Sequence, residues 1–269
     1  MKNLKIIIAY DGAKYNGWQK QGNTNNTIQQ KIEDIFSRYF EETIEISGSG
    51  RTDALVNALG QVANFHISDE CYERVFLKSN IDKNIINKDT FDNVRNELNS
   101  YMPLDIRIIK LSEASERFHA RLNATGKHYS YRIDNGDIAN VFERKYLYRL
   151  TEKLDMELMK KAAALLIGEH DFKSFCANKK MKKSTVRNVY DIKITKENGI
   201  VRIDYFGNGF LYNMVRIMTG TLIEIGLKKR TPESIIQIIE AKNRECAGYL
   251  VPGNALFLEE VYYDVTVQP

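Results

Sequence analysis

The chain has little cysteine and no long apolar run. Its three cysteines are widely spaced and form no C-x-x-C pair, which argues against a zinc knuckle and against a disulfide framework. The apolar run Ile6–Ala9 near the start is too short for a signal peptide or a membrane-spanning helix, and it is typical of a buried strand instead. We therefore expect a cytoplasmic protein with reduced thiols and no membrane segment.

Proline and low-complexity sequence are also scarce. Four prolines occur in 269 residues, and no Pro/Gly-rich linker divides the chain. Hydrophobic residues make up 43% of the sequence and charged residues 28%, values that exclude disorder and indicate a globular protein. Strand–helix–strand order recurs along the chain, so we expect an α+β fold with two related halves, 1–112 and 113–269. Each half should hold a mixed or antiparallel sheet backed by helices. Because no boundary is marked, the two sheets can be continuous.

Several elements carry clear local signals. Thr27 and Gln30 form a capping-box pattern ahead of a helical apolar spacing that runs through Phe40. Alternating runs on both sides of Asn198-Gly199 predict a β-hairpin. Further helices are expected to begin at Thr151, at Phe210 and at Thr231-Pro232.

The excess of positive charge is small, but it is unevenly distributed. The net charge is +4, from 39 Lys and Arg against 35 Asp and Glu. Three basic clusters contain no acidic residue: Arg121–Arg132, Lys173–Arg187 and Lys228–Arg230. Such clusters can neutralise phosphates, although a single charge run is more often a solvated loop. Together they favour a nucleic-acid partner.

Asp53 is the candidate catalytic residue. It lies in Gly48–Ala54, a glycine-rich turn in which the backbone can bend sharply and a ligand can approach closely. An acid presented there beside Arg51 and Thr52 can be a nucleophile or a base. Local chemistry alone favours the plainer interpretation, an acid that caps the turn.

Motifs for cofactors and metals are missing. The glycines of the Asp53 turn do not match G-x-G-x-x-G, and the lysine of a phosphate-binding loop is absent. The four histidines show no H-x-x-x-H pairing. We therefore expect neither a metal nor a cofactor.

Seven blocks of sequence, in order from Ile6 to Tyr263, resemble the tRNA pseudouridine synthase A family. They are Tyr10–Gln21, Gly50–Phe65, Leu98–Ile106, Phe118–Tyr131, Gly168–Phe175, Asn208–Gly226 and Pro252–Leu258. The resemblance implies an isomerase that converts uridine to pseudouridine in the anticodon stem-loop of tRNA, at positions 38–40, without metal or cofactor. It also implies a homodimer that binds tRNA, with an active-site cleft between the two halves of each chain.

The resemblance assigns roles by matched position. Asp53 matches the catalytic aspartate, which attacks the uridine at the ribose or the base. Arg216 matches the arginine that pairs with this carboxylate and keeps it ionised. Tyr129 matches a tyrosine that packs on the target base, and Leu256 a residue lining the uracil pocket. Arg51 matches an arginine that helps to hold the flipped nucleotide. Without the resemblance, Arg216 would be taken for a surface arginine, and Tyr129 and Leu256 for ordinary core residues.

Four positions depart from the family pattern. Leu55 stands where the family has glycine, and Leu adopts a positive φ less freely. Asn57 and Asn64 stand at histidine positions, and Ala255 at another glycine position. The charged segment 69–100 is also longer than usual. None of these departures touches Asp53, so we expect activity.

Two other functions stay open on the sequence alone. One is a non-catalytic RNA-binding or RNA-folding module on the same scaffold, which the departures at Leu55, Asn57 and Ala255 would suit. The other is a small-molecule enzyme on a ferredoxin-like sheet.

Overall fold

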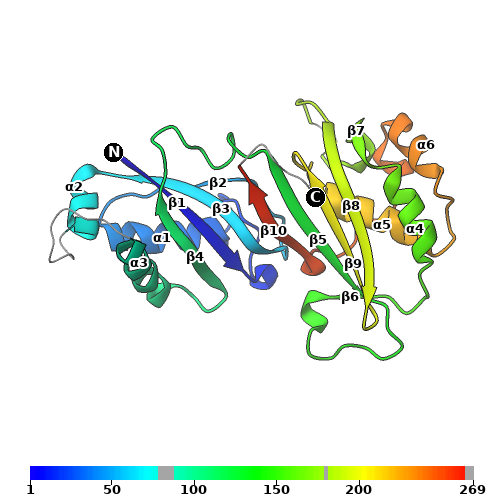
Figure 1. The fold of residues 1–269 in the computed structure, drawn as a ribbon, viewed down its shortest axis with the longest axis horizontal. Helices are drawn as coiled ribbons and strands as arrows, with labels where there is room; N and C mark the ends of the chain where they lie inside the picture. Colours follow the sequence, from blue (N-terminus) through cyan, green and yellow to red (C-terminus); the bar gives the residue numbers. More distant parts are fainter. Residues whose placement is uncertain (78–87, 179–180, 264–269) are drawn as a thin grey trace. The chain divides into compact units, whose positions relative to one another are not determined.

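The computed structural model describes residues 1–77, 88–178 and 181–263. The chain forms two compact units, Met1–Ala124 and Thr125–Pro269 (Figure 1). The sequence placed the division after residue 112. In the structure, the Asn3 side chain donates hydrogen bonds to the carbonyls of Ser115 and Phe118, at 2.9 and 2.8 Å, and so ties the following segment to the first unit.

The first unit holds an antiparallel sheet in the order β4–β1–β3, with β2 paired to β3. Leu4, Ile6 and Ile8 alternate along β1 and are fully buried, as the period of a strand requires when one face meets a core. The strands are β1 (Lys2–Tyr10), β2 (Ser47–Gly48), β3 (Asn57–Ile67) and β4 (Ile106–Glu113). The helices are α1 (Ile28–Phe40), α2 (Asp69–Tyr72) and α3 (Lys88–Tyr101), with short turns η1 (Gly12–Lys14) and η2 (Glu73–Leu77).

The second unit holds a sheet in the order β10–β5–β9–β8–β7, antiparallel throughout, with the short β6 parallel to β5. Helix α5 packs on one face of this sheet, where the Tyr205 hydroxyl lies 2.7 Å from Thr219 Oγ1. The strands are β5 (Gly126–Asp134), β6 (Tyr148–Arg149), β7 (Gly168–Asp171), β8 (Val186–Glu197), β9 (Ile200–Gly207) and β10 (Leu256–Tyr262). The helices are α4 (Met156–Ala164), α5 (Met214–Gly226) and α6 (Ser234–Ala241), with short turns η3 (Arg144–Tyr146), η4 (Phe172–Phe175), η5 (Arg244–Cys246) and η6 (Gly253–Ala255).

This architecture confirms the predicted α+β class and two of the strongest local signals. Thr27 caps α1 by accepting a hydrogen bond from the Gln30 backbone N–H at 3.3 Å. The β8–β9 hairpin turns at Asn198 and Gly199, with φ of 49° and 80°. Positive φ at both central residues is what a tight hairpin turn of this kind needs.

Three predicted helix starts were wrong. Helix α4 begins at Met156 rather than near Thr151, because Asp155 caps it by accepting from the Leu158 N–H at 3.2 Å. Helix α5 begins at Met214 rather than Phe210, and α6 begins at Ser234 rather than at Thr231-Pro232. Both begin late because a tight turn precedes the first helical residue.

The long charged segment is only partly described. Residues 78–87 lie outside the described residues, and the rest forms α2, η2 and α3. Among the described helices, none has both the length and the apolar character needed to cross a membrane.

Candidate active site

Asp53 lies in a tight turn between β2 and β3. The turn is closed by the Val56 N–H, which donates to the Asp53 carbonyl at 3.2 Å. Leu55, the second residue after Asp53, has a left-handed backbone with φ of 69°, and its side chain is 44% exposed. The position where the family has glycine therefore does require positive φ, and here leucine adopts it.

The turn is held from the N-terminal side by the loop after β1. The Trp18 N–H donates to the Thr52 carbonyl at 3.0 Å, and the Tyr10 hydroxyl lies 2.8 Å from Thr52 Oγ1. Tyr10 is buried, and burial raises the pKa of its hydroxyl although the Thr52 bond opposes the rise. These uncharged bonds fix the residue that immediately precedes Asp53.

Asn57 supplies a further tether. Its side-chain Oδ1 accepts the Gly12 N–H at 2.9 Å in a buried setting. A Cβ at Gly12 would lie 2.1 Å from the Val56 carbonyl oxygen, so the two backbones touch directly. Asn57, one of the departures from the family pattern, thus joins this loop to the end of the Asp53 turn.

Arg51 sits at the exposed edge of the same turn. Its Nε donates to Gln19 Oε1 at 3.0 Å, so the side chain is oriented by the loop that also holds Thr52. The guanidinium and Asp53 belong to one preorganised segment of the first unit.

The second unit places Tyr129 and Leu256 on the face of its sheet that carries α5. Tyr129 pairs with Tyr205 across β5 and β9, and Leu256 pairs with Tyr131 across β10 and β5. Tyr129 is 8% exposed, and its ring meets the edge of Phe210 at 5.4 Å between centroids and 84° between planes. The two residues therefore contribute a rigid, largely apolar surface.

Arg216, in the first turn of α5, is held in place by hydrogen bonds from its guanidinium. Nε donates to the Val251 carbonyl at 2.8 Å, and Nη1 donates to Asn213 Oδ1 at 2.9 Å. The Tyr131 hydroxyl donates to the adjacent Pro252 carbonyl at 2.9 Å. Burial raises the pKa of Tyr131, while the charge of Arg216 opposes the rise. Arg216 and Tyr131 thus both donate hydrogen bonds to the backbone segment Val251–Pro252. Tyr131 also pairs with Leu256 across β5 and β10.

That segment lies against α5 at backbone distance. A Cβ at Gly220 would lie 1.9 Å from the Tyr249 carbonyl oxygen, and a Cβ at Gly248 would lie 2.6 Å from the Thr221 backbone. The Gly248 N–H also donates to Thr221 Oγ1 at 2.9 Å. The Val251 acceptor of Arg216 is fixed through these contacts.

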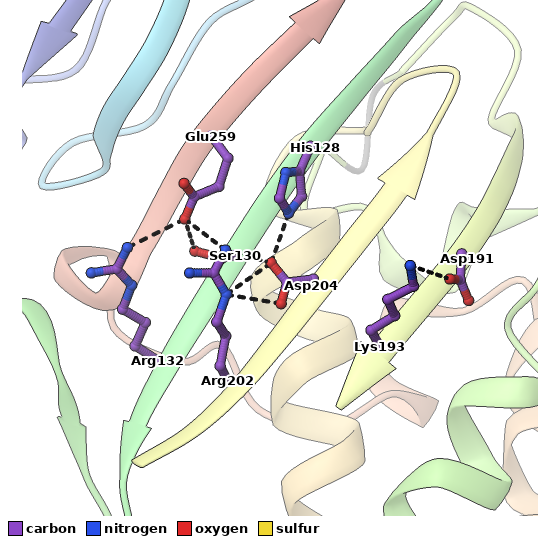
Figure 2. Close-up of polar contacts among 8 residues, drawn as sticks. All are labelled: His128, Ser130, Arg132, Asp191, Lys193, Arg202, Asp204 and Glu259. Atoms are coloured by element: carbon purple, nitrogen blue, oxygen red, sulfur yellow. Dashed lines mark hydrogen bonds and ion pairs between the residues drawn. The ribbon is translucent and has the colours of Figure 1, made fainter. Parts of the chain in front are cut away.

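The opposite face of the same strands carries a charged network (Figure 2). Glu259 on β10 accepts from Ser130 and Arg132 of β5 and from Arg202 of β9, the two arginine distances being 3.3 and 3.2 Å. Its side chain is 13% exposed. One carboxylate therefore links three neighbouring strands, including those that carry Tyr129 and Leu256.

Asp204 forms the second node of this network. Its Oδ1 lies 2.7 Å from His128 Nε2, and Arg202 binds both of its oxygens at 2.7 to 2.9 Å (Figure 2). Burial raises the pKa of Asp204, but the bonds to His128 and Arg202 outweigh it and hold the pKa below its ordinary value. The carboxylate stays ionised between β5 and β9.

The predicted site residues thus form two groups. Arg51 and Asp53 share one turn of the first unit, and Tyr129, Arg216 and Leu256 share one face of the second. No role was predicted from the sequence for Tyr10, Tyr131 or Asn213. All three lie within the blocks that carry the resemblance, but their contacts with Thr52, Pro252 and Arg216 join residues that no sequence motif pairs.

The basic clusters are less free than their sequence suggests. Lys228 pairs with Asp155 at 3.5 Å and Arg230 with Glu224 at 2.5 Å. Arg132 is engaged by Glu259, whereas Lys182 and Lys183 are exposed. Within the described ranges, no group of three or more His, Cys, Asp or Glu side chains could hold a metal ion.

Comparison with known proteins covers nearly the whole chain. The family model for tRNA pseudouridine synthase matches residues 6–121 and 162–264. The chain is 44% identical to tRNA pseudouridine synthase A 2 of Bacillus cereus (strain ZK / E33L), over 98% of this chain and 100% of that protein. It is 43% identical, with the same coverage, to tRNA pseudouridine synthase A of Bacillus sp. (strain KSM-64) and to tRNA pseudouridine synthase A 1 of Clostridium tetani (strain Massachusetts / E88).

A solved structure titled "Crystal Structure of a Cbf5-Nop10-Gar1 Complex" aligns with 82% of this chain and 45% of that chain at 12% identity. The TM-score is 0.35, which is too low to carry a conclusion. The family model is more informative, because its matched ranges include Asp53, Arg51, Arg216 and Leu256, while Tyr129 lies between them. On these matches, the chain belongs to the tRNA pseudouridine synthase family, a family of isomerases.

Proposed function

We propose that this chain isomerises uridine to pseudouridine in the anticodon stem-loop of tRNA, at positions 38–40, with Asp53 as the nucleophile. The observation that carries the proposal is the Asp53 turn itself. A carboxylate stands on a strained turn whose neighbours are fixed by Tyr10, Trp18 and Asn57. Strained, over-determined turns of this kind occur at functional sites.

The reaction rearranges one substrate. The Asp53 carboxylate attacks the uridine at the ribose or the base, and the bond between ribose C1′ and uracil N1 breaks. The uracil rotates, C1′ bonds to C5 instead, and the bond to Asp53 breaks, which regenerates the free carboxylate. The C5 proton leaves and N1 gains a proton, so nothing is oxidised or reduced. The proposed reaction needs neither a metal nor a cofactor.

The other site residues act on the flipped nucleotide. Tyr129 stacks on the uracil, a contact worth about 1–3 kcal/mol per base. Leu256 lines the uracil pocket, and Arg51 holds the displaced nucleotide. Arg216 pairs with Asp53 and favours its ionised form. The proposal requires that Asp53 of the first unit and Arg216 of the second reach the same uridine.

The RNA and the assembly belong to the same proposal. Exposed lysines such as Lys182 and Lys183 suit contacts with the phosphates of a stem that is read mostly by shape. The protein acts on tRNA in the cytoplasm as a homodimer.

The test uses an unmodified tRNA transcript with uridines at positions 38–40, incubated with the purified protein in EDTA. Pseudouridine should form at these positions, and a transcript with cytidines there should gain none. Tight, salt-sensitive binding without conversion of any uridine would instead support a non-catalytic RNA-binding module. Conversion at other positions would retain the activity and correct the target.

A further inference from the structure

We propose that Asn213 is a positioning residue that orients Arg216 for the reaction. This inference rests on the function proposed above, in which Arg216 pairs with the catalytic carboxylate. Asn213 stands directly before α5, and Arg216 lies three residues further along.

The side chain of Asn213 does not do what asparagine usually does before a helix. An asparagine at this position commonly accepts a backbone N–H of the first turn. Here the side chain makes no capping bond, and Oδ1 instead accepts from Arg216 Nη1 at 2.9 Å. The residue is 9% exposed, so the bond is largely shielded from water. A hydrogen bond from a charged donor in such a setting is stronger than one between neutral groups.

The backbone of Asn213 has a separate role. The Met214 N–H donates to the Leu211 carbonyl at 3.0 Å, which closes a turn with Asn213 at its third position. Asn213 has φ of 61° and ψ of 9°, a conformation that glycine and asparagine adopt most readily. Its sequence identity therefore has two explanations: the turn needs a left-handed residue, and Arg216 needs an acceptor.

Two fixed acceptors define the plane of the Arg216 guanidinium. Val251 accepts from Nε at 2.8 Å and Asn213 accepts from Nη1. The guanidinium is planar, so two bonds to different nitrogens set its orientation. Without Asn213, the group loses one of these two constraints, so its alignment with the reacting carboxylate is less well defined.

Glycine separates the two explanations. Asn213→Gly keeps the left-handed turn and removes only the acceptor. We expect kcat for pseudouridine formation to fall about tenfold, with KM for tRNA within about twofold and a protein that remains folded in a denaturant titration. Asn198→Gly is the matched control. It makes the same replacement at another left-handed position of the same unit, in the exposed β8–β9 turn, and should leave kcat unchanged.

A double-mutant cycle checks that Asn213 acts through Arg216. In an Arg216→Ala background, Asn213→Gly should cause no further loss of single-turnover rate. A full tenfold loss in that background, or an unchanged kcat in the single variant, would overturn the proposal.

A crystal structure of the Asn213→Gly variant keeps this test independent of the proposed activity. The Arg216 guanidinium should be reoriented while the backbone from Leu211 to Arg216 is retained. A guanidinium that stays in its original plane would overturn the positioning role even if the enzyme is active. If the wild type forms no pseudouridine while the variant shows the reorientation, the proposed function is wrong and the positioning role of Asn213 stands.

Discussion

The Asp53 turn of the first unit and the start of α5 in the second unit both contain a left-handed residue, but with different side chains. Each places a non-glycine residue with a left-handed backbone close to a proposed site residue: Leu55 beside Asp53, and Asn213 before Arg216. The Leu55 side chain is 44% exposed, whereas Asn213 is 9% exposed and binds Arg216. Leu55 thus supplies only the backbone conformation of its turn. Asn213 supplies the backbone conformation and also accepts a hydrogen bond from Arg216.

The two regions also share a close backbone contact at a glycine. Gly12 meets the Val56 carbonyl beside the Asp53 turn, and Gly220 meets the Tyr249 carbonyl beside the acceptor of Arg216. In both, the position of the functional group is set by a contact that a single methyl group would disturb. The two regions therefore differ in the part played by the left-handed residue, and substitutions can test each unit separately.

The largest effect is expected at Gly220. Gly220→Ala would place a Cβ 1.9 Å from the Tyr249 carbonyl oxygen, so the segment that holds the Val251 acceptor must move. We expect the free energy of unfolding to fall by about 3 kcal/mol, and pseudouridine formation to fall with it. Urea titration of both proteins measures the first quantity. An unchanged midpoint would mean that α5 and this segment are not in direct contact.

Gly12→Ala is the counterpart in the first unit. The new Cβ would lie 2.1 Å from the Val56 carbonyl oxygen, and the free energy of unfolding should fall by about 2 kcal/mol. Gly22→Ala, where a Cβ meets nothing within 4 Å, is the matched control and should be nearly neutral. Equal stability of the two variants would show that Gly12 does not lie against the Val56 carbonyl.

Acid should distinguish the two regions next. The bonds of Tyr10 and Asn57 that hold the Asp53 turn are uncharged, whereas the strands of Tyr129 and Leu256 are linked by carboxylates. The pKa of Asp204 is depressed in the folded protein, so its contribution to stability is present above the unfolded value of about 3.9 and is lost as pH falls through the folded pKa. Asp204→Asn should therefore be destabilising at pH 7, and the difference from the wild type should shrink below about pH 4. A difference that stays constant from pH 7 to pH 3.5 would argue against the ionised pair.

The smallest effect is expected at Leu55. A left-handed backbone costs a non-glycine residue about 1–2 kcal/mol. Glycine removes this cost, but it also raises the entropy of the unfolded chain, which offsets part of the gain in stability. Leu55→Gly should therefore stabilise the protein by less than about 1 kcal/mol and leave kcat unchanged. A loss of activity would give the exposed Leu55 side chain a role, and would remove its contrast with Asn213.

Local signals in the sequence were sufficient for much of the fold. Thr27 and the Asn198-Gly199 turn act through neighbours a few residues away, so their patterns predicted α1 and the β8–β9 hairpin correctly. The helix start predicted at Thr151 was wrong because Asp155, four residues later, caps α4 instead. The start of α5 failed because φ at Asn213 is set by a turn that periodicity does not reveal.

The site was harder to predict from the sequence than the fold. Asp53 was singled out by its turn but given a role only by the resemblance, and the tethers to Tyr10 and Asn57 are contacts between separate segments. Asn57 illustrates the limit. It was noted as a departure that lacks a titratable ring, yet its amide oxygen accepts the Gly12 N–H. No spacing rule predicts that contact, because it depends on two backbones meeting at van der Waals distance.

The most direct test of the central claim compares single-turnover rates of pseudouridine formation for the wild type, Asp53→Asn and Asp34→Asn on one unmodified tRNA. Asp34 is an exposed carboxylate on α1, so the two variants make the same chemical change at different places. We predict a rate loss of at least about 10³-fold for Asp53→Asn with tRNA binding retained, and a wild-type rate for Asp34→Asn. Comparable turnover by wild type and a folded Asp53→Asn protein would contradict the account.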